Sequence, residues 1–202
     1  MTFAIDDGFL PATLSAHPMT DEEFSEFCAE HPDLNFEMTA EGELIVMAPT
    51  HGDIGASNFD IAVQLGTWAK KDRRGYCCDS STGFVLPNGA RRSPDASWTL
   101  KSRVRQLGQR RRKSFWHLCP DFVIEVKSGS DRLRTLREKM LEYMEQGAQL
   151  GWLIAPDNKT VEVYRPNAKA PDKRAGLEVI EGEGPAEGFV LDLAEVWDPL
   201  DD

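Results

Sequence analysis

The run Pro120–Ser128 constrains this chain more than any other part of its sequence, because its pattern predicts a buried β-strand that carries charge. Side chains alternate between the two faces of a strand. One face therefore takes the apolar residues Phe122, Ile124 and Val126. The other face takes Glu125 and Lys127, which lie about 6.6 Å apart along the strand. This pair forms a catalytic site if a second acid joins it, and otherwise a minor ion pair worth about 0–1 kcal/mol.

Size and composition indicate an ordinary globular protein. The 202 residues suffice for one domain, which we expect over 1–202 with its core at about 20–197. Hydrophobic residues make up 41% of the sequence, and no apolar run approaches the roughly 18 residues that span a bilayer. Residues 1–14 carry two acids and lack the basic start of a secretory signal. We therefore expect a cytoplasmic protein that does not enter a membrane.

Charge is unevenly distributed along the chain. The formal net charge of -11 argues against binding of nucleic acid through the whole surface. Positive charge is concentrated in residues 101–113, which hold seven cations and no acid. We expect a basic loop there, which either contacts a phosphate backbone or is a solvated segment. The four cysteines lack zinc-site spacing, and the four histidines are too scattered for a histidine-rich metal centre.

Periodicity and turn residues predict alternating helices and strands. The expected elements are a helix capped by Thr20 and Glu23, a β-hairpin within 35–47, a long helix over 54–71, a β-meander within 76–100, a helix over 131–146 and a second hairpin within 151–164. This order favours a mixed sheet with helices packed against it, in an α/β or α+β domain.

A metal site at Glu125 needs a second acid from another strand. Asp121 is four strand residues away, about 13 Å, which is too far to share one ion. Asp157 belongs to the turn of the second hairpin and is expected to be a turn residue. Asp95 begins a short β run that can pair beside Glu125, and it is the best candidate.

Asp95, Glu125 and Lys127 form a chemically coherent set. Two carboxylates can hold a Mg²⁺ or Mn²⁺ that keeps several waters. Such an ion bridges a phosphodiester and lowers the pKa of an attacking water, while Lys127 orients that water or neutralises charge in the transition state. The set predicts a metal-dependent hydrolase of phosphodiesters. A serine hydrolase is not supported, because the sequence has no Gly-x-Ser-x-Gly elbow.

Pro94-Asp95 and Glu125-Val126-Lys127 resemble the signature of the PD-(D/E)XK nuclease superfamily. Further motifs extend the likeness over nearly the whole chain: Thr20–Phe24, Glu37, Gly42–Pro49, His51-Gly52, Ser80–Phe84, Ser93–Asp95, Pro120–Val126, Lys139, Tyr143, Gly147, Trp152 and Val161–Pro166. In this order and spacing they resemble the Uma-two family of endonucleases. The resemblance implies a restriction-endonuclease-like α/β fold, a mixed β-sheet core flanked by helices with β-hairpin additions.

The resemblance also implies roles for individual residues. Asp95 and Glu125 would be metal ligands, Lys127 the catalytic cation and Glu37 an additional acid. Many members of the family lack a Lys at the position of Lys127, so this chain matches the wider superfamily better. Superfamily members often pair to cut both strands, which implies a homodimer.

Three residues have two interpretations each. His51 could approach the site or simply start the long helix. Lys139 and Tyr143 could support the site indirectly, or belong to a plain amphipathic helix.

The sequence therefore predicts a Mg²⁺- or Mn²⁺-dependent endonuclease whose substrate is DNA. Two alternatives stay open: a catalytically silent nucleic-acid- or protein-binding module on the same fold, and a hydrolase of a smaller phosphate ester.

Overall fold

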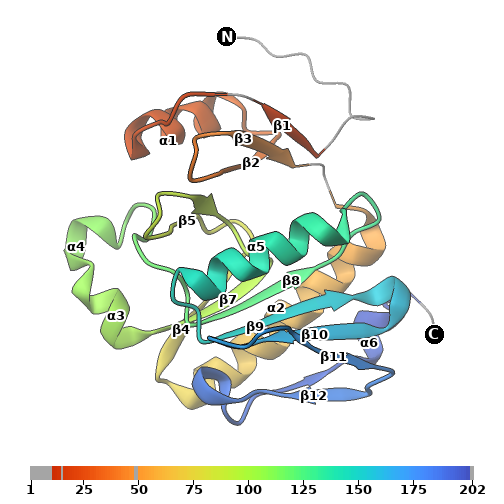
Figure 1. The fold of residues 1–202 in the computed structure, drawn as a ribbon. Helices are drawn as coiled ribbons and strands as arrows, with labels where there is room; N and C mark the ends of the chain where they lie inside the picture. The colour runs from red at the N-terminus through yellow and green to blue at the C-terminus, as the bar shows by residue number, and fades with distance from the viewer. Residues whose placement is uncertain (1–10, 15, 48–49, 201–202) are drawn as a thin grey trace.

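A mixed six-stranded sheet forms the centre of the protein, seen here in a computed structural model (Figure 1). In spatial order its strands are β11 (Asp172–Ala175), β10 (Thr160–Tyr164), β9 (Leu150–Ala155), β8 (Phe122–Val126), β7 (Ala96–Leu100) and β4 (Gly75–Asp79). Strands β8 and β9 are parallel, with Phe122 opposite Leu150, and the other pairs are antiparallel. The mixed sheet expected from the sequence is confirmed.

A smaller sheet forms a lobe above the large one (Figure 1). Its strands are, in spatial order, β1 (Ala12–Leu14), β3 (Leu44–Met47), β2 (Asn35–Met38), β6 (Arg91–Arg92) and β5 (Phe84–Val85). A two-stranded sheet of β12 (Val179–Glu181) and β13 (Val190–Asp192) lies near the C-terminus. The helices are α1 (Asp21–Glu30), α2 (Gly52–Asp72), α3 (Lys101–Gln106), α4 (Gly108–Arg111), α5 (Leu133–Glu145) and α6 (Ala194–Trp197).

The structure describes residues 11–14, 16–47 and 50–200, with residues 110 and 111 described by their backbone alone. The prediction that the N-terminal segment is not a secretory signal concerns residues 1–14, of which 1–10 lie outside the described residues. Positions 48 and 49 of the family motif Gly42–Pro49 also lie outside them. Within the described ranges, no helix is both long and apolar enough to cross a membrane.

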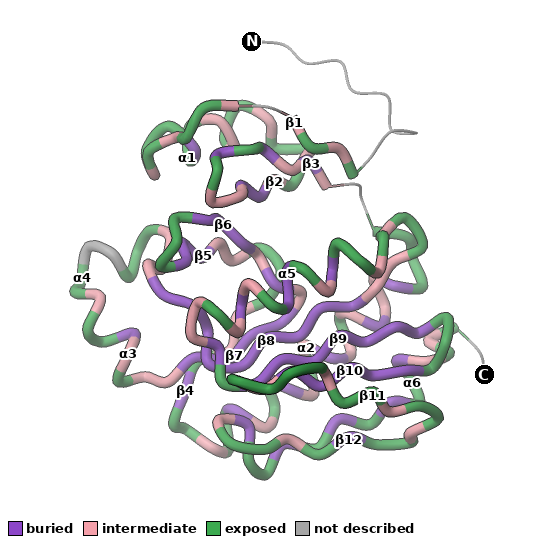
Figure 2. The backbone as a smooth tube through the Cα atoms, viewed as in Figure 1, coloured by how far each residue is buried: buried purple, intermediate pink, exposed green. Residues whose placement is uncertain are grey.

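The alternation predicted for β8 is present, and it divides the core into two layers. Phe122, Ile124 and Val126 pack in one cluster with Ile61 and Leu65 of α2. Val123 packs on the opposite face with the apolar residues of α5, Leu136, Met140 and Tyr143. Helices α2 and α5 thus cover opposite faces of the sheet, and its central strands are buried (Figure 2).

Local signals in the N-terminal half are confirmed. Thr20 caps α1 as predicted: its Oγ1 accepts the Glu23 amide at 3.2 Å, and its own amide donates to the Glu23 carboxylate at 2.7 Å. The first hairpin forms from β2 and β3 in antiparallel register. Gly42 closes its turn with a φ of +90°, a conformation that favours glycine.

The expected meander within 76–100 is wrong in its connections. Strand β4 pairs directly with β7 in the large sheet, whereas β5 and β6 pair with each other and reach β2 of the lobe through Met38 and Arg91. The side chains of β6 explain this pairing, because Arg91 forms an ion pair with Asp21 and Arg92 with Glu37. Such distant ion pairs leave no local pattern in the sequence.

The basic segment 101–113 is not a plain loop, since most of it forms α3 and α4. Val104 anchors α3 in the core cluster that contains Val123. Arg103 adds an ion pair to the buried Asp121 at 2.8 Å. Two apolar residues, Val104 and the partly buried Leu107, are too few to show a helical periodicity, so the pattern does not predict a helix here.

We expect Gly75→Ala to lower the free energy of unfolding by about 1–3 kcal/mol. A Cβ at position 75 would lie 2.1 Å from Cε2 of Trp98, which is fully buried. Gly55→Ala is the matched control in α2, where an added Cβ meets no atom within 4 Å, and a gain of about 0.5–1 kcal/mol is expected. Urea unfolding of the three proteins checks this, and equal stability would contradict the close packing of β4 on Trp98.

Candidate active site

Asp95 and Glu125 lie opposite each other at one end of two neighbouring strands. Ala96 faces Ile124 in the antiparallel register of β7 and β8, so the preceding Asp95 comes opposite Glu125. Asp95 Oδ2 accepts the backbone amide of Val126 at 2.7 Å, which fixes its carboxylate at the end of β8. The juxtaposition of these two acids, expected from the sequence, is present in the structure.

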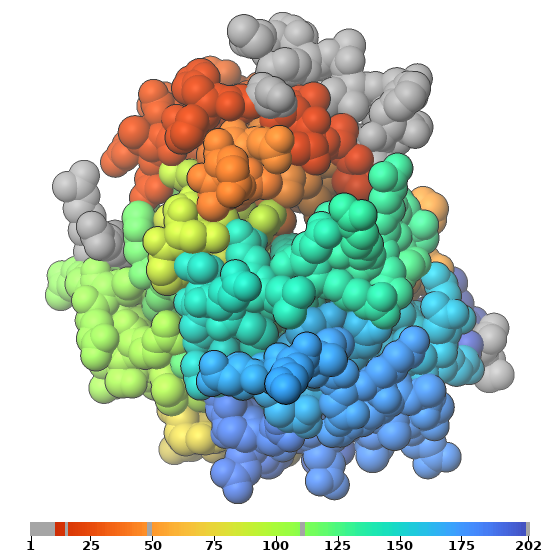
Figure 3. All heavy atoms as spheres, viewed as in Figure 1, coloured from red at the N-terminus to blue at the C-terminus, as the bar shows by residue number. Residues whose placement is uncertain are grey.

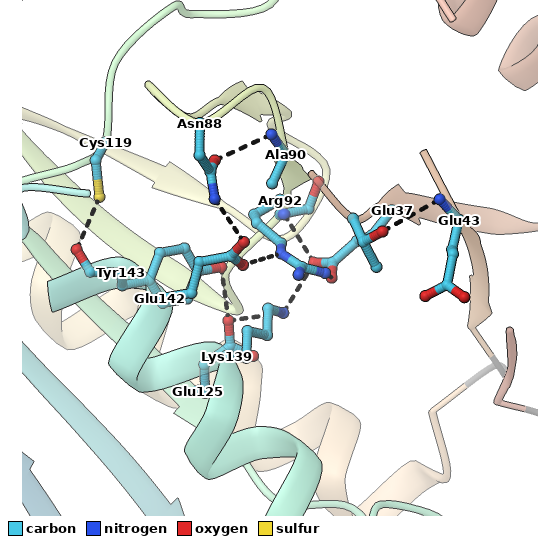
Figure 4. Close-up of polar contacts among 12 residues, drawn as sticks. Glu37, Glu43, Asn88, Ala90, Arg92, Cys119, Glu125, Lys139, Glu142 and Tyr143 are labelled. Carbon is cyan, nitrogen blue, oxygen red and sulfur yellow. Dashed lines mark hydrogen bonds and ion pairs between the residues drawn. The ribbon is translucent and has the colours of Figure 1, made fainter. Parts of the chain in front are cut away.

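Lys139 of α5 connects Glu125 to the lobe (Figure 4). Its ammonium lies 2.8 Å from Glu125 Oε1 and 2.8 Å from Glu37 Oε1. One turn further along α5, the Tyr143 hydroxyl donates to Glu125 Oε1 at 3.0 Å. All four side chains are buried. Glu37, expected only as a possible additional acid, is therefore close to the other acids, although it sits on a hairpin strand where acids are usually solvated.

Arg92 completes the surroundings of Glu37. Its guanidinium donates to Glu37 Oε2 at 3.2 Å and to Glu142 Oε2 at 2.6 Å. The backbone amide of Ser93 donates to Glu37 Oε1 at 2.8 Å. The lobe is thus joined to α5 through a buried network that includes two cations.

The Lys127 ammonium forms no ion pair with Glu125, although the sequence predicts that the two side chains share one face of the strand. The ammonium donates to the Ser128 carbonyl at 2.9 Å and lies 3.2 Å from the Asp157 carboxylate. The strand β8 ends at Val126, so strand alternation no longer sets the direction of the next side chain. A pattern of Glu-x-Lys fixes the direction of both side chains only while the strand continues.

The other acids weighed from the sequence have structural roles. Asp121 accepts the Leu100 amide at 2.8 Å and pairs with Arg103, away from Glu125 as the distance argument required. Asp157 is in the turn between β9 and β10, as predicted, and it also lines the cavity that contains Asp95 and Glu125. His51 precedes α2 as its N-cap and also lines the cavity next to Asp95, so both of its interpretations are compatible with the structure.

The sequence analysis gave Lys139 only an indirect role, although one signal pointed to it. Lys139 and Tyr143 lie one turn apart on the face of α5 that also carries Leu136 and Met140, and all four are buried. A Lys on the apolar face of a helix needs a buried anionic partner. Glu125 and Glu37 are those partners.

Burial and charge shift the pKa values of the cluster. Burial raises the pKa of Asp95 to about 6 and, assisted by the charge of Asp95, that of Glu125 to about 8, although Lys139 opposes both shifts. Burial acts on Glu37 in the same direction, but Lys139 and Arg92 outweigh it and lower its pKa. Burial disfavours the charged form of Lys139, yet its two carboxylate partners raise its pKa overall. Asp95 and Glu125 therefore hold their protons more tightly than exposed acids do, whereas Glu37 releases its proton more readily.

A cavity of about 150 Å³ gives access to these acids, and Asn58, Asp95, Glu125 and Lys139 line it. Lys139 and Glu37 also line a groove between the lobe and α5, where the surface is hollowed (Figure 3). Lys139 therefore lies where the groove adjoins the cavity.

The donors in the cavity fit a hard divalent cation. Asn58 donates to Asp95 Oδ1 at 3.3 Å, while its own Oδ1 is buried without a hydrogen-bond partner. That oxygen and two carboxylates are the type of ligand Mg²⁺ takes, and Mg²⁺ keeps several waters besides one or two carboxylates. Within the described part of the chain no three His, Cys, Asp or Glu side chains are grouped so that they could hold a metal ion, so an ion held by Asp95 and Glu125 would need water ligands.

We expect Lys139→Met to lower the free energy of unfolding by about 3–5 kcal/mol, because two buried carboxylates lose their shared cation. Arg134→Met is the matched control on the same helix: it removes an exposed i,i+4 pair with Glu138, worth under about 1 kcal/mol. Chemical denaturation compares the two variants. A loss as small as that of the control would contradict the buried network.

Comparison with known proteins agrees with this architecture. A family named Uma2 and described as "Putative restriction endonuclease" matches residues 21–194. A crystal structure of a "putative nuclease belonging to DUF820" from Anabaena variabilis superposes with a TM-score of 0.72 at 21% identity, covering 89% of this chain and 98% of that one. No curated protein matches the chain. At this identity the crystal structure shows a common fold, whereas the family match spans most of the sequence. The chain belongs to the Uma2 family, whose members are described as putative restriction endonucleases.

Proposed function

We propose that this protein is a metal-dependent endonuclease that hydrolyses phosphodiester bonds in DNA. The observation that carries the proposal is the position of Asp95 opposite Glu125, with the Lys139 ammonium 2.8 Å from Glu125, in a single cavity. Membership of the Uma2 family supports a nuclease.

In this proposal Asp95 and Glu125 hold a Mg²⁺ or Mn²⁺, with the Asn58 carbonyl oxygen as a third donor. When bound, the ion supplies an acidified water and a positive charge near the phosphate. Lys139 takes the role expected for Lys127: its ammonium opposes protonation of Glu125 and would stabilise negative charge that develops on the phosphate. Glu37 and Tyr143 position Lys139 and Glu125 and need not touch the substrate.

Plasmid nicking in Mg²⁺ tests the site assignment. Asp95→Asn, Glu125→Gln and Lys139→Arg are each expected to lower the rate by about 100- to 1,000-fold, because each removes one charge or misplaces it. Lys127→Met tests the competing assignment and is expected to keep the activity of the unaltered protein, since the Lys127 ammonium pairs with Asp157 and that of Lys139 with Glu125. Equal nicking by all five proteins would show that the activity comes from a contaminant.

A small diester, bis(4-nitrophenyl) phosphate, separates the alternatives in the same series. Hydrolysis of this ester without nicking of DNA would favour a hydrolase of smaller phosphate esters. DNA binding without hydrolysis of either substrate would favour the silent binding module.

Metal affinity should rise with pH between about 6 and 8. The acid pKa values of about 6 for Asp95 and about 8 for Glu125 mean that bound protons must leave before both carboxylates can coordinate an ion. Above both values no proton is displaced and the affinity becomes constant. Calorimetric Mn²⁺ titrations at several pH values measure this. In Glu125→Gln the rise near pH 8 should disappear, and an affinity of the unaltered protein that is independent of pH would contradict the assignment.

A further inference from the structure

Cations from two separate segments gather at the end of the molecule away from the site. Helix α2 ends with Lys70 and Lys71, followed by Arg73, and α3 carries Lys101 and Arg105. Except for the half-buried Lys101, these side chains are exposed. We call this set of five residues the basic edge.

Tertiary contacts bring the two segments of the basic edge together. The Lys101 amide donates to the Arg74 carbonyl at 2.9 Å, and the Lys101 ammonium donates to the Arg73 carbonyl at 2.5 Å. The same ammonium lies 5.4 Å from the centre of the Tyr76 ring. Helix α3 is therefore held beside the turn between α2 and β4 (Figure 1).

Most of these cations are uncompensated. Neighbouring Arg74 pairs with Asp72, and Arg103 with Asp121. Lys70, Lys71, Arg73 and Arg105, by contrast, have no carboxylate within ion-pair distance among the residues that the structure describes. Four unpaired cations on a chain with a net charge of -11 concentrate positive potential in one place. Their natural ligand is a polyanion.

We propose that the basic edge contacts the phosphate backbone of the DNA whose scissile bond lies in the active site. This inference rests on the proposed function. Strand β7 follows Asp95 and ends just before Lys101, so six strand residues separate the site from the basic edge by about 20 Å. Successive phosphates of one strand lie about 3.4 Å apart along the helix axis. The contacted phosphates are then about six base pairs from the scissile bond.

Helix α2 gives a second estimate of the same separation. It begins after His51, which lines the catalytic cavity, and ends at Asp72 within the basic edge. Its 21 residues span about 31 Å. A duplex that extends about six to nine base pairs beyond the cut thus reaches the basic edge, whereas a shorter one fills only the site.

The test measures binding of two duplexes, 8 and 24 base pairs long and closed by hairpin loops, with EDTA present to prevent cleavage. The variant Lys71→Glu/Arg105→Glu reverses two unpaired cations of the basic edge. Lys169→Glu/Lys173→Glu is the matched control, since it reverses two exposed cations at the opposite side of the large sheet. Fluorescence anisotropy at increasing salt gives the affinity and its salt dependence.

The basic-edge variant should bind the long duplex more weakly, with the slope of log affinity against log salt reduced by about 2, one for each lost phosphate contact. Its affinity for the short duplex should match that of the control. The proposal is overturned if the variant keeps the affinity and slope of the unaltered protein, if the control loses as much, if the unaltered protein binds neither duplex, or if polyglutamate displaces the long duplex as well as unlabelled DNA does.

This readout is independent of catalysis. Loss of long-duplex binding in the basic-edge variant supports the basic edge even if the protein nicks no plasmid, in which case only the proposed hydrolysis fails. Nicking by the unaltered protein together with unchanged binding by the variant would support the proposed active site and refute the proposed DNA contact of the basic edge.

Discussion

The ammonium of Lys139, held between Glu37 and Glu125, is the interaction on which the rest of this structure depends. The ammonium itself is carried by an α-helix, and its two partners come from a strand of the lobe and a central strand of the large sheet. A buried charge is tolerated only when its partners are in place, because each lost partner leaves an uncompensated ion in a medium of low polarity. The site is therefore assembled only when all three parts of the fold have docked, and the same contact joins the lobe to the core.

The two arginines of β6 add further buried ion pairs that join the lobe to the rest of the fold. Arg91 reaches Asp21 at the start of α1, and Arg92 lies between Glu37 and Glu142. Buried ion pairs of this kind contribute little net stability compared with apolar packing, but they specify which surfaces meet. Here they set the lobe over α5, and the groove lined by both parts includes Lys139, which also lines the cavity of Asp95 and Glu125. The buried charges that join the lobe to α5 thus also surround the candidate site.

The strand pattern was sufficient to predict half of the candidate site. Period-two alternation placed Glu125 on the face of β8 opposite Phe122, Ile124 and Val126, and the distance and turn arguments left Asp95 as its partner. Lys127 was misplaced because alternation stops where the strand stops. The position of Lys139 on the apolar face of α5 is a local signal that it needs a buried anionic partner. The identity of that partner and the burial of Glu37 depend on contacts between segments about 100 residues apart, which no local pattern encodes. The hairpin of β5 and β6 joined the lobe for the same reason, through ion pairs that the sequence does not reveal.

The central claim is that Asp95 and Glu125 share a divalent ion beside Lys139. A crystal soaked in Mn²⁺ and measured at the manganese absorption edge tests it directly. The account predicts one strong anomalous peak about 2.1 Å from a carboxylate oxygen of each acid, with the Asn58 amide oxygen near it and the Lys127 ammonium still at Asp157. A peak held by other residues, or none at saturating Mn²⁺, would contradict it.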